Sequence, residues 1–378
     1  MNVNATLERS SELLQPGPIR EILNAPGPCV TVFLPPYRPG EPAGSTGALI
    51  KLDVRSAVDE LVERRFPRPA AENLLRPLEK AEFAQGSHLG KVAFVSPDVS
   101  DHCFLIRPLG SRVIVGGCFS IVRLLRELRH PKIFYILALS NERVRLLRCS
   151  GLHIEQASLP AGVEETLAAA LAFKPPDHTL VNRSTAGSST GAMHGVRFGT
   201  GSGRETERTH LEDFYKLVDR GVKRVCGDAP LILAGVNEQT AVYRGLSACP
   251  GLMEGAIRGS LDRPNDLLEQ AYGILDDDLC ERDAAALLNS CERATPARVS
   301  TGLDTVLKAA FEGRVSELYI NESAQTTGVF TGHGYRSWGS EDLLNLAAVQ
   351  TLLHKGEACA LPADRMANGS MVTAVLRY

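Results

Sequence analysis

The chain has 378 residues and a formal net charge of −3 at pH 7, with 44% hydrophobic and 22% charged residues. These values are close to those of average globular proteins, and they argue against a disordered, collagen-like or coiled-coil chain. They also exclude a chain that is basic throughout, so any contact with nucleic acid has to come from a local cluster of cations. At about 100–200 residues per domain, the length predicts two or three domains.

The sequence lacks the usual signs of export, membrane insertion and metal binding. No apolar run reaches the roughly 18–20 residues that span a bilayer. The first residues have no basic stretch followed by an apolar core, as a secretory signal would. The nine cysteines are scattered and form no CxxC pair, so several would act as small hydrophobes in apolar runs. We expect a protein of the reducing cytoplasm, with no membrane or DNA partner, no metal and no cofactor.

The first third of the chain alternates strands with helices. Strands are expected at 30–34, 92–95, 103–106 and 113–115, and helices over 50–65, 70–83 and 121–128. The helix over 50–65 is the clearest, because its apolar residues recur at spacings of three and four. A His-Pro pair at 130–131 ends this part of the chain.

The middle third opens with a continuously apolar stretch that is typical of a buried strand. This strand, over 133–139, is followed by strands at 144–147 and 152–157 with turns between them, which predicts a meander. Further elements are expected as helices over 163–171, 209–225 and 238–246 and a strand over 231–236. Thr209 and Glu212 have the spacing of a capping box, so the helix is expected to begin at Thr209.

The last third repeats the alternation after a polar stretch, RGSLDRPND at 258–266, which is the predicted linker. Helices are expected over 267–293, 301–312 and 341–354, and strands over 315–320, 358–361 and 371–376. Asn368 and Gly369 predict a tight turn between the last two strands. Alternation three times over predicts an α/β fold with three tandem α/β domains, at 1–129, 130–258 and 267–378.

A glycine-rich loop is predicted over 178–205, within the middle domain. Its sequence from 178 to 204, HTLVNRSTAGSSTGAMHGVRFGTGSGR, contains Arg183, Arg197 and Arg204 and no acidic residue. The loop should therefore be cationic, flexible and exposed. Long loops without structure of their own are uncommon in compact domains, and they are usually functional or disordered. The alternative is a surface insertion that has no function.

Three chemistries compete for this loop. The glycines over 199–203 could present backbone N–H groups to a phosphate beside a helix start, but the Lys and Ser/Thr of a Walker motif are replaced by Arg204 and Glu205. Residues 187–191 match GxSxG, but more glycine loop follows where a nucleophile elbow needs a helix. The third is a loop of a nucleic-acid-directed protein, in which cations contact phosphates. The residues for this contact are Arg183, Arg197, Arg204, Arg208 and His210.

Three segments resemble a known family. They are TERTHLEDFYKLVDRGVKRV at 206–225, LDTVLKAAFEGRVSELYINES at 303–323, and EDLLNLAAVQTLLHKGEACALPADRMANGSMVTAVLRY at 341–378. Their order resembles the archaeo-eukaryotic class of peptide-chain release factors and Pelota, and more closely the bacterial archaeo-eukaryotic release factor-like family. The resemblance covers roughly 130–378. It implies an RNase H-like middle domain and a C-terminal domain similar to the third domain of Pelota and release factors.

The resemblance also implies an activity on the ribosome. In release factors the corresponding loop carries a Gly-Gly-Gln motif, which helps water to cleave peptidyl-tRNA. This sequence has no Gly-Gly-Gln, and the nearest equivalent lies between His194 and Arg204. The implied catalytic residues are His194, Gly199, Gly201, Ser202 and Gly203. No Asn-Ile-Lys-Ser type element occurs in residues 1–129, so peptidyl-tRNA hydrolysis or ribosome rescue without stop-codon reading is expected. The implied partners are the ribosome and tRNA, with a translational GTPase as a further candidate.

Two other functions stay open on the sequence alone. One is a non-catalytic ribosome- or RNA-binding or docking protein, and the other is a stand-alone hydrolase or phosphate-binding enzyme that uses the same loop. A two-metal nuclease is disfavoured, because the apolar strands at 133–139 and 231–236 carry no carboxylate. The run Asp276–Asp278 is interpreted as a solvated helix face. His333, Tyr335 and Trp338, in a second glycine-rich loop, are interpreted as a surface cluster.

Overall fold

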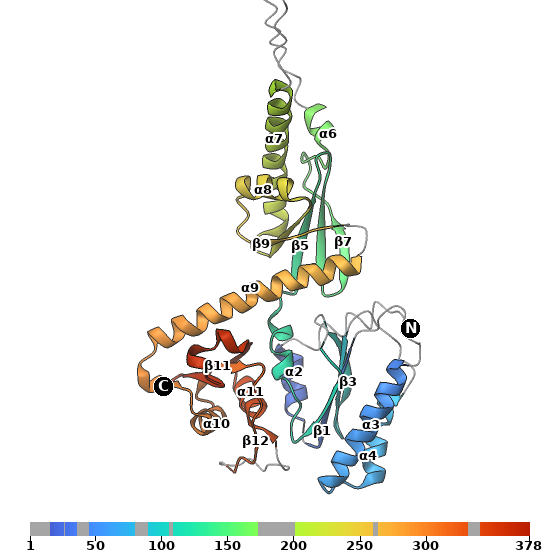
Figure 1. Cartoon of the computed structure of the whole chain (residues 1–378), viewed down its shortest axis with the longest axis vertical. Coiled ribbons are helices and arrows are strands. Elements are labelled where there is room, and N and C mark those ends of the chain that lie inside the picture. The colour runs from blue at the N-terminus through green and yellow to red at the C-terminus, as the bar shows by residue number, and fades with distance from the viewer. Residues whose placement is uncertain are drawn as a thin grey trace, which may run out of the picture. The chain divides into compact units, whose positions relative to one another are not determined.

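The computed structural model describes residues 16–25, 27–35, 45–79, 90–105, 109–172, 201–259, 264–331 and 341–378. It has two compact units: unit 1 comprises Met1–His130 and Leu275–Tyr378, and unit 2 comprises Pro131–Ile274. Helices and strands alternate in both, which confirms the mixed α/β class (Figure 1). The chain passes between the units beside the predicted boundary at 129–130, and again at 274–275, beyond the predicted linker. The division into three domains stays a prediction.

The first sheet of unit 1 is antiparallel, in the order β3-β2-β1-β4. Its strands are β1 (Cys29–Leu34), β2 (Gly90–Val95), β3 (Ser100–Leu105) and β4 (Arg112–Gly116). Side chains of successive residues point to opposite faces of a strand. One face of this sheet, with Val30 and Val32, packs on helices α3 (Ser45–Glu63) and α4 (Arg68–Leu75). The 3₁₀ turn η1 (Arg76–Glu79) follows α4, so the helix expected over 70–83 is shorter than predicted.

The second sheet of unit 1 is mixed, in the order β10-β15-β11-β14. Its strands are β10 (Val299–Ser300), β11 (Val315–Asn321), β14 (Glu357–Leu361) and β15 (Val372–Leu376). A short pair, β12 (Thr327–Gly328) and β13 (Glu341–Asp342), accompanies it. The predicted turn is present, with Gly369 at φ +65°. However, β14 and β15 do not pair with each other, because each of them pairs with β11.

The two sheets of unit 1 share one hydrophobic core. Helices α2 (Pro16–Leu23), α10 (Leu303–Phe311) and α11 (Leu343–Leu353) contribute to it. Phe33 and Phe94 face it from the first sheet, and Phe94 meets Phe119 edge to face at 5.3 Å. From the last part of the chain, Leu344 and Leu318 complete the same cluster. The beginning and end of the chain are therefore joined by burial of apolar surface.

Unit 2 is built on a five-stranded sheet in the order β7-β6-β5-β8-β9. Its strands are β5 (Ile133–Leu139), β6 (Val144–Ser150), β7 (His153–Ala157), β8 (Leu231–Ala234) and β9 (Leu252–Ile257). The first three form the predicted antiparallel meander, and β8 and β9 run parallel to β5 and β8 respectively. The other helices of the unit are α6 (Leu167–Ala172), α7 (Gly201–Cys226) and α8 (Asn237–Leu246).

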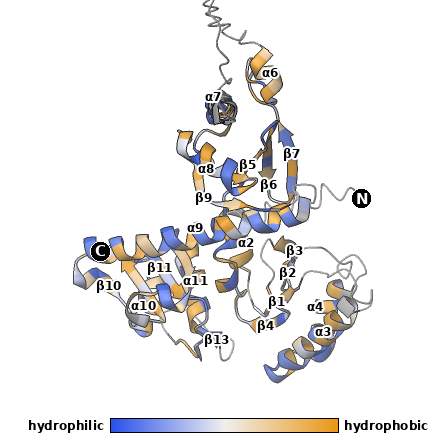
Figure 2. Ribbon diagram, turned by 45° about the horizontal axis from the view of Figure 1, so that its top comes forward, coloured by the Kyte–Doolittle hydropathy of each residue, from blue (hydrophilic) through white to orange (hydrophobic). Residues whose placement is uncertain are grey.

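The longest helix, α9 (Pro264–Arg293), contains the passage from unit 2 to unit 1. Its first part belongs to unit 2, where the ring of Tyr272 meets Phe134 at 5.1 Å and its hydroxyl donates to Gly151 O at 2.6 Å. Its later part packs in unit 1, where Leu287 is buried beside Tyr319. Hydrophilic and hydrophobic residues alternate along the helix (Figure 2).

Three further expected helices differ from the structure. In place of a helix over 121–128 there are 3₁₀ turns η2 (Val122–Leu124) and η3 (Glu127–Arg129), and Asn345 Oδ1 accepts from the backbone N of Ile121 and Val122 at the start of this segment. The helix expected over 163–171 is the shorter α6. The prediction that α7 begins at Thr209 is wrong, since it begins at Gly201 and the Thr209–Glu212 pair lies inside it.

The described helices include none that is long and apolar enough to cross a membrane.

Candidate functional site

The structure places some of the sequence-predicted site residues and leaves others outside its description. Arg183, His194, Arg197 and Gly199 lie outside the described residues. The prediction of a loop up to residue 205 is wrong at its end, because α7 already begins at Gly201. The predicted residues at the start of this helix are Gly201, Ser202, Gly203 and Arg204.

Helix α7 is held on the sheet of unit 2 by a buried carboxylate. Asp219, 6% exposed, accepts hydrogen bonds from Tyr243 Oη at 3.0 Å, Ser247 Oγ at 2.6 Å and Ala248 N at 3.0 Å. Burial raises the pKa of this carboxyl, but the hydrogen bonds outweigh it and lower the pKa below its ordinary value. The charged form of Asp219 therefore fixes α7 against α8 and the turn after it.

Aromatic packing supports the same helix face. Tyr215 and Tyr243 are fully buried and meet edge to face at 5.7 Å. The Tyr215 hydroxyl donates to Ser140 O at 3.3 Å, at the end of β5. Such pairs add to the free energy gained by burying the rings. With this side anchored, the opposite side of α7 is presented to solvent.

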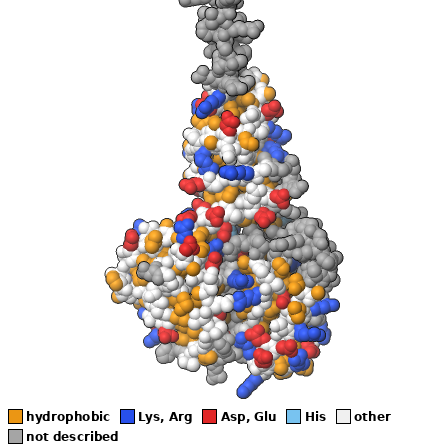
Figure 3. All heavy atoms as spheres, viewed as in Figure 1, with side chains coloured by type: hydrophobic (Ala, Val, Ile, Leu, Met, Phe, Trp, Pro, Cys, Tyr) orange, Lys and Arg blue, Asp and Glu red, His pale blue; other side chains and the backbone are white. Residues whose placement is uncertain are grey.

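The solvent-facing side of α7 is cationic in its second half. Its exposed cations are Lys216, Arg220, Lys223 and Arg224, and the acid within this stretch is the buried Asp219. Arg220, Lys223 and Arg224 have no ion pair within the described part of the chain. Figure 3 shows lysine and arginine side chains, with some acidic ones, over the part of unit 2 that contains α7. We call these four residues the α7 cations.

Of the predicted RNA-contacting residues nearer the helix start whose side chains the structure describes, one is in an ion pair and one is not. Arg208 pairs with Glu212 at 3.1 Å, and His210 is exposed. An exposed pair of this kind contributes little to stability and can be exchanged for a phosphate contact. The α7 cations are not among the predicted site residues, although the helical spacing of four basic residues over 216–224 is visible in the sequence.

The prediction that Asp276–Asp278 is a solvated face is wrong for Asp276. Its carboxylate lies 3.0 Å from Arg126 Nη1, and the same guanidinium lies 3.1 Å from Glu322. Asp277 is exposed, and Asp278 pairs with Arg282. Among the residues that the structure describes, no group of three His, Cys, Asp or Glu could hold a metal ion. The cluster at His333, Tyr335 and Trp338 lies outside them.

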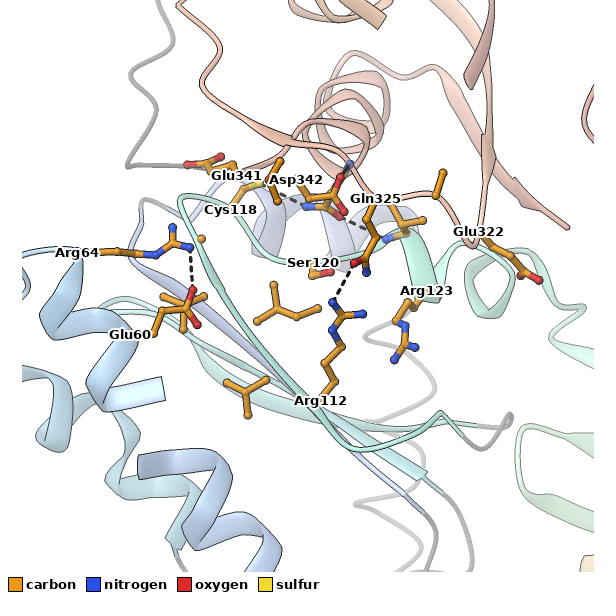
Figure 4. Close-up of a pocket in the computed structure, with 18 residues that line it drawn as sticks. Glu60, Arg64, Arg112, Cys118, Ser120, Arg123, Glu322, Gln325, Glu341 and Asp342 are labelled. Atoms are coloured by element: carbon orange, nitrogen blue, oxygen red, sulfur yellow. Dashed lines mark hydrogen bonds and ion pairs between the residues drawn. The ribbon is translucent and has the colours of Figure 1, made fainter. Parts of the chain in front are cut away.

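A second candidate site is a cavity of about 290 Å³ in unit 1, beside strand β4 (Figure 4). The Arg112 Nη2 donates to Gln325 Oε1 at 3.3 Å, and Gly117 N donates to Glu341 Oε1 at 3.2 Å. Burial raises the pKa of Asp342 in its wall, against backbone N–H groups that lower it in part. The sequence could not signal this cavity, because its walls come from three distant parts of the chain.

One protein-family model matches a stretch of the chain that begins in unit 2 and ends in unit 1. The class of protein that this match indicates is release-factor-like. The match is to bacterial archaeo-eukaryotic release factor family 3 over residues 133–314. The match covers a little less than half of the chain, and it confirms the predicted resemblance to a release-factor-like family.

Solved structures of an archaeal termination factor and of Pelota can be aligned with the chain at low sequence identity. An archaeal translation termination factor, aRF1, is 12% identical over 99% of this chain and 98% of its own, with a TM-score of 0.24. Archaeoglobus fulgidus Pelota is 12% identical over 77% and 80%, with a TM-score of 0.37. Ribosome-bound archaeal Pelota, solved with ABCE1, is 13% identical over 77% and 78%, with a TM-score of 0.32. No curated protein matches the chain.

Proposed function

We propose that the protein acts in translation, on ribosome-bound RNA, and that unit 2 makes the contact through α7. The observation that carries this proposal is the row of α7 cations on the exposed side of a helix whose other side is anchored by Asp219. Exposed Lys and Arg side chains at helical spacing fit the phosphates of an RNA backbone. The family match over 133–314, which includes all of α7, also supports a function in translation.

The finer activity that we propose is hydrolysis of the ester of peptidyl-tRNA, without stop-codon reading. Backbone N–H groups around Gly199, Gly201 and Gly203 would orient a water and stabilise the developing oxyanion. His194 and Ser202 are the side chains proposed to position that water. The arginines of the glycine-rich segment would bind the phosphates beside the ester. The ribosome, tRNA and a translational GTPase are the proposed partners, in the cytoplasm.

The RNase H-like assignment of the middle domain belongs to this proposal. The central position of β5, with a meander on one side and two parallel strands on the other, supports it. The apolar strands β5 and β8 carry no carboxylate, so the proposed role of this sheet is to present α7 rather than to bind catalytic metals.

The test of RNA contact is ribosome co-sedimentation at a series of salt concentrations. The triple variant Arg220→Gln/Lys223→Gln/Arg224→Gln should bind more weakly, and its slope of log K against log salt should be smaller by about two, at about 0.7–0.9 per phosphate contact. The matched control is Lys51→Gln/Arg55→Gln/Arg293→Gln, which removes the same charge from exposed positions in unit 1. Equal weakening by the control, or no co-sedimentation at low salt, would refute the proposal.

A non-catalytic ribosome-binding function is the second candidate. The observation that favours it is the helical position of Gly201–Gly203, since a helix offers less freedom to a reacting loop than the predicted coil. Peptidyl-tRNA cleavage by the wild type, lost in His194→Ala or Ser202→Ala, supports hydrolysis. Binding without cleavage supports the second candidate. Cleavage of a small ester with no ribosome present would instead favour a stand-alone hydrolase.

A further inference from the structure

The second sheet of unit 1 gathers basic residues at one of its ends. Strand β10 pairs antiparallel with β15, β15 pairs antiparallel with β11, and β11 pairs parallel with β14. The start of β10, the end of β15 and the starts of β11 and β14 therefore lie at the same end of the sheet. A cation stands beside each of these four points. In sheet order they are Arg298, Arg377, Arg314 and Lys355, which we call the strand-end cations.

Hydrogen bonds join the strand-end cations into one surface. The backbone N of Arg377 donates to Arg314 O at 2.8 Å, and Arg377 Nη2 donates at 2.8 Å to the carbonyl of His354, the residue before the fourth cation. Arg298 Nε donates to Leu376 O at 2.8 Å. Because neighbouring strands lie about 4.8 Å apart, the four cations span about 14 Å. A row of this length matches several successive charges of a polymer better than one free phosphate.

The acids near the strand-end cations already have partners. Three acids lie within three residues of one of these cations in the sequence. Glu312 pairs with Arg314 Nε at 2.7 Å, Glu357 pairs with Arg129 Nη1 at 3.2 Å, and the half-buried Glu317 accepts from two hydroxyl groups. The other three strand-end cations are exposed, and none of them has an ion pair among the residues that the structure describes. The surface therefore keeps a positive charge.

The carbonyl contacts of Arg298 and Arg377 fix the two guanidinium groups without using them up. A guanidinium has five N–H donors in a rigid fork, and each of these two gives one to the carbonyl. Most donors of each fork are thus available to a ligand, in the planar geometry that suits phosphate oxygens.

An exposed aromatic ring adjoins the cations and distinguishes RNA from an acidic protein. Tyr378 follows Arg377 and is 74% exposed, and it is the one exposed large hydrophobic side chain within three residues of a described strand-end cation. Figure 2 marks the end of the chain beside β10. A protein partner would need an apolar core to its interface, whereas cations around a single ring are typical of surfaces that bind unpaired RNA.

We propose that the strand-end cations and Tyr378 bind single-stranded RNA. The cations contact successive phosphates of one strand, and the ring stacks on an unpaired base. The choice of RNA as the partner rests on the proposed function, but this surface belongs to unit 1, whereas α7 belongs to unit 2.

The probe that tests the surface is fluorescein-labelled dodecauridylate, measured by fluorescence polarisation with full chains that all carry the triple α7 variant. Adding Lys355→Gln/Arg377→Gln should weaken binding about tenfold and reduce the slope of log K against log salt by about 1.4, at about 0.7 per phosphate contact. Tyr378→Ala should weaken it at least about fivefold, and Tyr378→Phe, which keeps the ring, should leave it unchanged. The matched control, Lys51→Gln/Arg55→Gln, alters exposed cations of α3 and should also leave it unchanged.

A second measurement uses the wild-type protein, so its result is independent of folding in any variant. The same oligonucleotide with 4-thiouridine is irradiated with the protein, and mass spectrometry of the peptides should find an adduct at Tyr378 or beside a strand-end cation. Loss of ribosome binding in the α7 variant does not enter either measurement, so the two proposals can fail separately.

Four results would overturn the inference. They are adducts confined to other segments, no effect of Lys355→Gln/Arg377→Gln, equal weakening by the α3 control, and equal binding of an RNA duplex. Displacement of the RNA by oligoglutamate of the same charge at the same concentration would also overturn it, since it would mark a surface for acidic proteins.

Discussion

Replacing Asp219 with asparagine tests the anchoring of α7. The carboxylate accepts from Tyr243, Ser247 and Ala248, and the asparagine amide would turn an NH₂ group toward one of these donors. Hydrogen bonds to a charged acceptor are each worth about 1.5–3 kcal/mol. The asparagine would lose one of these three hydrogen bonds and would accept the other two with a neutral oxygen. The free energy of unfolding of unit 2 should therefore fall by about 3 kcal/mol. Asp213→Asn, at an exposed pair on the same helix, is the control and should cost less than about 0.5 kcal/mol.

The pH dependence of this loss gives a second, independent measure. Hydrogen bonding holds the pKa of Asp219 below its ordinary value in the folded state. A depressed folded pKa stabilises the protein above the unfolded pKa, about 3.9 for aspartate, and this contribution disappears as the pH falls through the folded pKa. The wild type should therefore exceed Asp219→Asn by a constant amount from pH 7 to about pH 5, and by less below about pH 4.

The assay is urea unfolding at pH 7, 5, 4 and 3, read by pulsed hydrogen exchange of peptides from α7 and β8. This readout follows unit 2 separately from unit 1, so one two-state transition need not describe the whole chain. A loss in Asp219→Asn no larger than that in Asp213→Asn would refute the anchoring role. A stability difference between the wild type and Asp219→Asn that stays constant down to pH 3 would refute the conclusion that Asp219 is charged in the folded protein.

Three further outcomes are expected. Gly251→Ala should destabilise unit 2 by about 3 kcal/mol in the same exchange assay, because its Cβ would overlap the carbonyl of Ala229. Gly273→Ala lies in a helix with open space around it, and should stabilise unit 2 by about 0.5–1 kcal/mol. A Gly251→Ala variant that is more stable than Gly273→Ala would contradict the packing. Arg126→Leu should cost unit 1 about 3–5 kcal/mol in urea, since it leaves two half-buried carboxylates without their cation; a neutral effect would mean that these charges are solvated. Burial raises the pKa of Cys149 to about 12, so this thiol should react with a disulfide reagent at pH 8 only after unfolding, and labelling of the native protein would contradict its burial.

Local pattern was enough to predict much of the fold. The strands β5, β6 and β8 were found because unbroken or alternating apolar residues mark buried strands. The start of α7 was missed because 201–208 is polar and rich in glycine, with no apolar period to read. The segment 121–128 was predicted as one helix but forms the turns η2 and η3, and its first backbone donors, at Ile121 and Val122, meet Asn345, more than 200 residues away, which no local pattern records.

The candidate sites differ in how far sequence could reach them. The α7 cations all lie on one helix, so their spacing in the sequence is enough to predict that they share a face. The cavity beside β4 depends on Arg112, Gln325 and Glu341 meeting in three dimensions, and no local pattern records that meeting. The burial of Asp276 is of the same kind, because its partner Arg126 lies in the other half of unit 1.

The shared core of unit 1 has a consequence for synthesis of the chain. Phe33 and Phe94 are covered in part by Leu344 and Leu318, which leave the ribosome more than 200 residues later. At about 5–20 residues per second, the first sheet waits for tens of seconds with one apolar face only partly covered. Unit 2, continuous from Pro131 to Ile274, can fold during that interval. The nascent first sheet is thus exposed to aggregation during this interval, and a chaperone that covers its apolar face would assist folding.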